Sequence, residues 1–208
     1  MNTNRNQHTL KLVQLGLFTA IILLMAFTPL GYIKTPGLEI TLLVVPVTVG
    51  AILFGPTGGA ILGGIFGLTS FIQCFGMSAF GAVLLNINPV GTFIVTVVSR
   101  ILMGWLTGLS FHAFRKWSVT KGIPFAAASL AGPLLNTVLF MSTLMLFFYN
   151  TDYIQGIADA LGTGNIFTFV IAFVGINGLI EAAVCFVLGT AIAKAVDVFT
   201  KRSGIQTR

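Results

Sequence analysis

The sequence predicts an all-α integral membrane protein in which six transmembrane helices form one compact bundle with both termini in the cytoplasm. The first reason is composition, because 56% of the 208 residues are hydrophobic and only 8% are charged, whereas soluble domains carry about 25% charged residues. The second reason is that the apolar runs are long and continuous, unlike the short alternating strands of a membrane barrel. We expect a single transmembrane domain, residues 1–208, with spans at about 12–33, 40–54, 58–72, 88–114, 125–149 and 166–196.

The distribution of basic residues predicts the orientation. They gather before the first span, between the fourth and fifth spans, and at the end of the chain: Arg5, Lys11, Arg115, Lys116, Lys121, Lys201, Arg202 and Arg208. The opposite side has Lys34 alone. Because cytoplasmic connectors carry the excess of Lys and Arg, both termini are expected inside. The same rule accounts for the net charge of +6, which therefore does not indicate a nucleic-acid partner.

The first span carries a pair of small residues, Gly16 and Ala20, four positions apart. Such a pair lets another helix approach closely. Both packing inside the bundle and docking to another protein are compatible with this pattern.

The second and third spans are separated by GPTGGA at 55–60. This stretch lacks the lysine and the spacing of a phosphate-binding loop, so we predict a tight cytoplasmic turn. In the third span, Gly59, Gly63 and Gly67 recur every four residues along one helical face. They predict a smooth groove against a neighbouring helix.

The connector at 73–88 reads QCFGMSAFGAVLLNIN and carries no charge. A loop this apolar is expected to fold back over the protein, either as a lid over a pocket or as an interfacial segment.

The fourth span carries one full charge in its middle, Arg100. From Asn88 to Arg100 the rise is about 18 Å, near the centre of a hydrocarbon core about 30 Å thick. Because a charge at that depth is costly in lipid, Arg100 should face a polar pocket or a partner. Thr92 and Thr96 lie on the same helical face, and Asn88 precedes them at the same spacing.

The fifth and sixth spans add further polar groups. Pro133 frees backbone groups in the fifth span, and Asn136, followed by Thr137, can satisfy them or reach a ligand. Asn177 and Glu181 are four residues apart on one face of the sixth span, and Glu181 is the only acid deep inside a span.

These residues form one candidate substrate-binding set, all from the last three spans: Asn88, Thr92, Thr96, Arg100, Asn136, Asn177 and Glu181. We therefore expect one half of the chain to bind a solute and the other half to pack against something else. The alternative is a structural ion pair between Arg100 and Glu181. The Asn and Thr side chains around them exceed what one ion pair needs, which favours the solute site.

Motifs of enzymes are missing. The sequence has no GxSxG, no HExxH and no pair of carboxylates in one span. Cys74 and Cys185 lack metal-ligand spacing, so we expect two unpaired structural thiols. The prediction is a protein without catalytic residues, metal or cofactor. Because it has no nucleotide-hydrolysis motif, active transport would need another protein as its energy source.

Several stretches together carry a resemblance to a known family. Besides Gly16 and Ala20, they are LEITLLVVPVTVGAILFGPTGGAILGGIFGLTSFI at 38–72, SRILMGWLTGL at 99–109, GPLLNTVLF at 132–140 and INGLIEAAV at 176–184. Over nearly its whole length the chain resembles the membrane-embedded substrate-binding (S) components of energy-coupling factor (ECF) vitamin transporters. One departure is Gly16, where the family's first-helix motif usually has alanine.

The resemblance implies a multi-pass protein of the bacterial plasma membrane that binds a vitamin from outside with high affinity. It also implies association, through the Gly16 and Ala20 face, with a transmembrane coupling protein and two ABC-type ATPases that drive import. The stretches are most similar to pantothenate-type members. Pantothenate offers a carboxylate for Arg100, and hydroxyl and amide groups for Asn136, Asn177 and Glu181. Pyridoxine-type and folate-type components share parts of the pattern, and a structural or assembly membrane protein is the alternative outside transport.

Overall fold

The computed structural model describes residues 3–33, 40–117 and 122–202. The elements follow one another as α1 Thr3–Ala26, β1 Tyr32–Ile33, β2 Ile40–Thr41, α2 Val44–Gln73, α3 Ala79–Ile87, α4 Pro89–Phe93, η1 Ile94–Val98, α5 Ser99–Trp117, α6 Ile123–Phe148, α7 Asp152–Ala160, α8 Ile166–Val184, η2 Cys185–Gly189 and α9 Thr190–Arg202. The elements η1 and η2 are single π-helical turns inside longer helices. The molecule is thus essentially helical, as its composition predicts.

The first helix begins and ends earlier than predicted. The span expected at 12–33 ends as a helix at Ala26, because Pro29 cannot continue the backbone hydrogen-bond ladder. The chain then turns, and β1 pairs antiparallel with β2, Tyr32 opposite Thr41. The helix expected to start at residue 40 therefore begins at Val44. The predicted polar turn at 34–39, with Lys34, lies outside the described residues.

The expected reversal between spans two and three takes place at a single residue of α2. Gly55 has φ 77° and ψ −170°, a backbone conformation that is essentially restricted to glycine. The side chain of Leu62 lies against Gly50, and the methyl group of Ala51 lies against Gly59. In a straight helix these pairs would be about 18 Å and 12 Å apart, so the two halves of α2 fold back on each other. The turn predicted over 55–60 is thus wrong in extent, because Pro56 already begins the second half, a position that suits proline.

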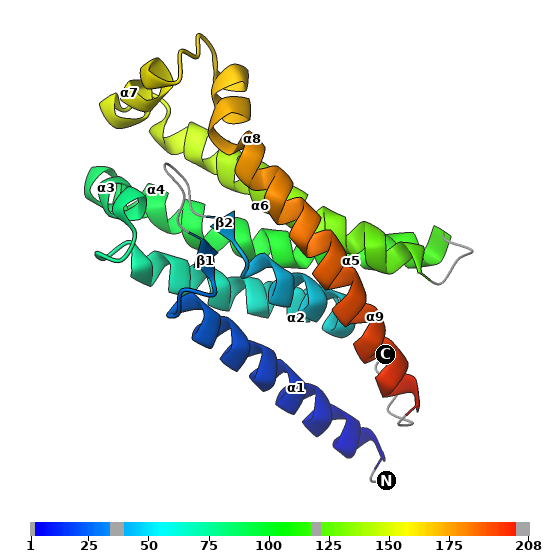
Figure 1. Cartoon of the computed structure of the whole chain (residues 1–208). Coiled ribbons are helices and arrows are strands. Elements are labelled where there is room, and N and C mark those ends of the chain that lie inside the picture. Colours follow the sequence, from blue (N-terminus) through cyan, green and yellow to red (C-terminus); the bar gives the residue numbers. More distant parts are fainter. Residues whose placement is uncertain (1–2, 34–39, 118–121, 203–208) are drawn as a thin grey trace.

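The glycine-lined groove predicted on the third span receives α5. A Cβ atom at Gly59 would meet the carbonyl oxygen of Gly104, and one at Gly63 would meet the carbonyl oxygen of Arg100. The backbones of α2 and α5 are therefore in contact, and this close pair forms the centre of the bundle (Figure 1).

The described residues form two hydrophobic clusters in the bundle. One joins α1, α2, α5 and α6 around Ile22, Leu62, Phe66 and Met103. The other joins α6, α7 and α8 around Leu144, Phe148, Ile154 and Phe169. The start of α1 and the end of α9 lie at the same end of the molecule, and α3 and α7 lie at the opposite end (Figure 1).

Among the described residues, five helical segments are long and apolar enough to cross a membrane: Thr9–Ala26, Val44–Gln73, Pro89–Trp117, Ile123–Phe148 and Asn177–Val196. The spans predicted at 40–54 and 58–72 both fall largely within Val44–Gln73, where the chain reverses at Gly55. The segment Asn177–Val196 covers the second part of the span predicted at 166–196. The helical region Pro89–Trp117 extends slightly beyond the span predicted at 88–114.

Candidate functional site

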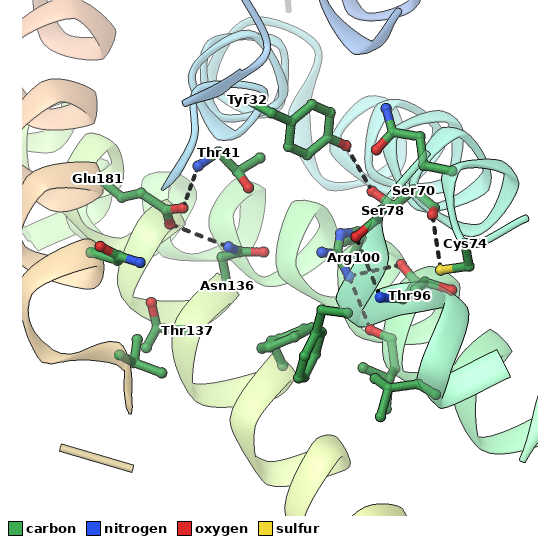
Figure 2. Close-up of a pocket in the computed structure, with 18 of the residues that line it drawn as sticks. Tyr32, Thr41, Ser70, Cys74, Ser78, Thr96, Arg100, Asn136, Thr137 and Glu181 are labelled. Carbon is green, nitrogen blue, oxygen red and sulfur yellow. Dashed lines mark hydrogen bonds between the residues drawn. The ribbon is translucent and has the colours of Figure 1, made fainter. Parts of the chain in front are cut away.

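A cavity of about 350 Å³ opens between the β1–β2 pair and the helices α2, α3, α5, α6 and α8 (Figure 2). Its polar lining is Tyr32, Thr41, Ser70, Gln73, Cys74, Ser78, Thr96, Arg100, Asn136, Thr137, Asn177 and Glu181. Its apolar and glycine lining is Ala79, Phe80, Gly81, Leu84, Val95, Phe140, Val174 and Gly178. A hollow in which apolar side chains surround convergent polar groups is typical of a small-molecule site.

Arg100 lies in the first turn of α5, directly after the π-turn η1. Its Nη1 donates hydrogen bonds to the carbonyl oxygens of Val95, at 3.0 Å, and Thr96, at 3.1 Å. Its buried Nε has no hydrogen-bond acceptor in the described parts of the chain. The guanidinium carbon lies 4.8 Å from the centre of the Phe66 ring and 5.4 Å from that of Phe140, distances at which a cation is attracted to an aromatic face. Backbone dipoles and two rings therefore hold the cation, and part of its donor set makes no hydrogen bond to the described residues.

The π-turn η1 supplies the backbone carbonyls that accept hydrogen bonds from the Arg100 side chain. In η1 the Ser99 amide donates to the carbonyl of Ile94, five residues back, instead of four as in an α-helix. Single π-turns occur frequently at functional sites. Here the widened turn lies immediately before the buried charge and supplies both carbonyl acceptors of Nη1.

Glu181 lies on the opposite side of the cavity from Arg100 (Figure 2). Its carboxylate accepts the backbone N–H of Thr41 at 2.7 Å and the side-chain amide of Asn136 at 3.5 Å. Glu181, Asn136 and Arg100 are each 8% exposed, so all three groups are buried. The first bond also attaches β2 to α8, which closes one wall of the cavity.

The two opposite charges do not form a salt bridge with each other. No described acid lies within 4.0 Å of the Arg100 guanidinium, whose hydrogen bonds go to helix carbonyls, and the Glu181 carboxylate is satisfied by Thr41 and Asn136. The structural ion pair considered from the sequence is therefore not present. The charges instead give the cavity a positive and a negative side.

The structure brings five of the seven predicted binding residues to the cavity: Thr96, Arg100, Asn136, Asn177 and Glu181. Thr92 and Asn88 do not line it. The Thr92 hydroxyl donates to the carbonyl of Asn88 at 2.9 Å, and the Asn88 side chain caps α4 by accepting the Gly91 amide at 2.9 Å. Both side chains thus serve the local helix, although they share a face with Thr96.

The first half of the chain contributes more to the cavity than expected. Ser70, Gln73 and Cys74 from the end of α2, and Tyr32 and Thr41 from the strand pair, all line it. The Tyr32 hydroxyl and the Ser70 hydroxyl are 3.1 Å apart, and the Gln73 amide donates to the carbonyl of Ala26 at 2.6 Å. The expected division into a binding half and a packing half is therefore wrong. For Ser70 and Gln73, the sequence signal was the group of polar residues in TSFIQ at 69–73.

Gly16 and Ala20 lie on the exposed surface of α1, away from the cavity. A Cβ atom at Gly16 would meet nothing within 4 Å, and the neighbouring Leu12, Val13 and Leu17 are also exposed. Packing inside the bundle therefore does not explain the small-residue pair.

Comparison with known proteins gives matches along nearly the whole chain. Residues 10–193 match the family described as "ECF transporter, substrate-specific component". The chain is 31% identical to the pantothenate transporter PanT of Leuconostoc mesenteroides subsp. mesenteroides, over 97% of this chain and 98% of that protein. It is 32% identical to the pantothenic acid transporter PanT of Lactococcus lactis subsp. cremoris, over 74% of this chain and 76% of that protein.

Proposed function

This chain belongs to the substrate-specific components of ECF transporters, and we propose that it is the high-affinity pantothenate-binding subunit of an ATP-driven importer. Membership makes it a multi-pass bacterial membrane protein that serves transport rather than catalysis, with a vitamin as substrate and an ECF module as partner. The names of the two relatives support pantothenate. The observation that carries the proposal is the cavity, with a cation on one side and a carboxylate with amide groups on the other.

We place the ligand carboxylate at Arg100. Nη1 is occupied by the two helix carbonyls, whereas Nε and Nη2 bond to no residue in the described parts of the chain. Donors along one edge of a guanidinium can bind a carboxylate with two parallel hydrogen bonds, which gives both strength and geometric selectivity. Such a contact supplies the negative charge that the buried cation lacks.

The hydroxyl and amide groups of pantothenate are placed toward Glu181, Asn136 and Asn177. A ligand hydroxyl can donate to the Glu181 carboxylate, and the side-chain amides can both donate and accept. The Thr96 hydroxyl donates to the carbonyl of Thr92 at 2.7 Å, so its own oxygen can still accept a hydrogen bond from the ligand. The polarity of the ligand therefore matches the polarity of the cavity along its length.

The same features disfavour the two other vitamins suggested by the resemblance. Pyridoxine is not an anion at neutral pH, so it would leave the Arg100 charge without a counter-charge. Folate is anionic but larger, and a cavity of about 350 Å³ is near the lower end of ligand sites, which span about 300–1,000 Å³.

We further propose six membrane crossings with both termini in the cytoplasm. The halves of α2 count separately, because the chain reverses at Gly55, and an even number of crossings returns the chain to its starting side. Lys11, Arg115 and Lys116 then lie inside, and α7 with its two aspartates lies outside. A reporter fused after Arg208 should be active only in the cytoplasm, and one inserted after Gly162 only outside. An external signal from the first fusion would contradict this topology.

The exposed small-residue pair on α1 is proposed to dock on the transmembrane coupling protein, which connects this subunit to two ATPases. Gly16→Leu combined with Ala20→Leu should then abolish vitamin uptake in cells and leave binding by the purified protein unchanged. Ile21→Phe, which adds bulk at an exposed position that the helical period turns away from the Gly16–Ala20 face, is the control and should preserve both activities. Equal loss of binding and uptake in the double variant would show that the pair acts inside the subunit instead.

The direct test of the function is to identify and titrate the ligand. Small molecules released from the purified protein should include pantothenate by mass spectrometry. Calorimetric titration should show saturable binding of pantothenate, and none of pyridoxine or folate at the same concentrations. Binding of either competitor, with no response to pantothenate, would overturn the proposed substrate.

A further inference from the structure

The contact between α2 and α5 is a backbone contact, and it surrounds Arg100. A Cβ atom at Gly67 would lie 2.7 Å from Cα of Val97 and 2.8 Å from the carbonyl oxygen of Thr96. One turn earlier, a Cβ atom at Gly63 would meet the carbonyl oxygen of Arg100 itself. Real Cβ atoms essentially never approach other atoms closer than 3.0 Å, so neither position accepts a side chain without movement of α5.

The contact at Gly67 leads directly to the guanidinium. The Thr96 carbonyl that lies against Gly67 is one of the two that accept Nη1 of Arg100, at 3.1 Å. Phe66, the residue before Gly67, is fully buried and places its ring 4.8 Å from the guanidinium carbon. This one turn of α2 therefore touches both the backbone that holds the cation and the cation itself.

We propose that Gly63 and Gly67 are positioning residues that set the place of the Arg100 guanidinium in the cavity and thereby the preference for a ligand with a carboxylate. A side chain at either position would push the π-turn and Arg100 away from α2. Binding sites require their contact groups to be held to within about 0.5 Å, and a two-bond contact with a carboxylate is especially sensitive to direction. The proposal rests on the proposed function, in which Arg100 binds that carboxylate.

The test compares two ligands that differ only at the carboxylate. Pantothenol carries a hydroxymethyl group where pantothenate carries its carboxylate. The dissociation constant of pantothenol divided by that of pantothenate therefore reports the contact with Arg100. Because both are measured on the same sample, the ratio does not depend on the fraction of protein that is folded. The variants are Gly67→Ala and Gly63→Ala in the full chain.

The chain offers two matched controls on α2. At Gly64 a Cβ atom would be 3.4 Å from the Ile101 side chain, an ordinary contact, so Gly64→Ala adds the same methyl group without crowding. At Gly59 a Cβ atom would meet the Gly104 backbone, so Gly59→Ala crowds the same helix pair one turn further from Arg100. Thermal unfolding of all four variants measures how much each substitution destabilises the packing of α2 against α5.

The expected result is a ratio reduced by about tenfold or more in Gly67→Ala and Gly63→Ala, and unchanged in Gly64→Ala and Gly59→Ala. A wild-type ratio in Gly67→Ala and Gly63→Ala would overturn the proposal. An equal reduction in Gly59→Ala, or loss of all binding in both test variants, would assign the glycines to helix packing alone and also overturn it. A wild-type protein that does not distinguish the two ligands would instead refute the proposed contact of Arg100.

Discussion

The two sides of the cavity solve the same physical problem, a buried charge, in different ways. On one side, Arg100 rests on the carbonyls of its own helix and between two aromatic rings. On the other side, Glu181 is held by groups from two other elements, the Thr41 amide of β2 and the Asn136 side chain of α6. The positive side is thus built within one helix, and the negative side is built by tertiary contacts.

This difference indicates what each side can do. The carbonyls that hold Arg100 carry partial charges only, so the cation still lacks a full counter-charge, which a ligand can bring. Glu181 accepts two protein hydrogen bonds and joins β2 to α8, so its loss affects the wall of the cavity as well as the ligand. We therefore expect substitutions of Arg100 to lower ligand affinity most. Substitutions of Glu181 should lower affinity less and disturb the local structure more.

The largest expected effect comes from removing the cation. Arg100→Ala should weaken pantothenate binding by about a hundredfold or more, since the loss of one partner from a buried charged contact costs about 3–5 kcal/mol and about 1.4 kcal/mol is tenfold in affinity. Arg100→Lys should recover only part, because lysine supplies the charge without the paired donors. Titration calorimetry measures both variants, and full recovery in Arg100→Lys would contradict a two-bond contact.

A smaller effect is expected at the other side. Glu181→Gln should weaken binding by about tenfold, because a hydrogen bond to a charged group contributes about 1.5–3 kcal/mol. Since the two charges form no salt bridge, the losses of unfolding free energy in Arg100→Ala and Glu181→Gln should add to within about 0.5 kcal/mol in the double variant. Restored stability in the double variant would show that the two groups are coupled after all.

The smallest effect is expected from two threonines on one helical face. Thr96→Val should weaken pantothenate binding by about fivefold, the equivalent of one net hydrogen bond of about 1 kcal/mol, because Thr96 lines the cavity. Thr92→Val should leave affinity unchanged, because Thr92 is fully buried and bonds to Asn88. The same titrations compare them, and equal losses would place Thr92 in the binding site.

These threonines also show how much of the cavity could be predicted from the sequence. Regular helical spacing predicts Thr92, Thr96 and Arg100 on one face, but it does not say where along that face the cavity ends. The π-turn η1 lies between Thr92 and Arg100 and shifts the positions before it. No residue pattern in IVTVV predicts such a turn, so Thr92 and Asn88 were included in the predicted binding set from their spacing alone.

The polar cavity residues that sequence reasoning missed come from the first half of the chain. Charge and depth identify Arg100 and Glu181, because a charge in a membrane span needs an explanation. Ser70 and Gln73 are uncharged and lie near the end of α2, and Tyr32 lies in the short strand β1; polar residues are ordinary at such positions. They reach the cavity because α2 reverses at Gly55 and the strand pair folds over it, a tertiary arrangement that hydrophobic periodicity does not contain.

The central claim is that Arg100 binds the ligand carboxylate. The most direct test titrates pantothenate and pantothenol against the wild-type protein and against Arg100→Ala, with thermal unfolding to confirm that the variant is folded. We predict that the wild type prefers pantothenate by about a hundredfold or more and that this preference largely disappears in Arg100→Ala, because only the carboxylate contact is lost. A folded Arg100→Ala protein that keeps the wild-type preference would contradict the claim.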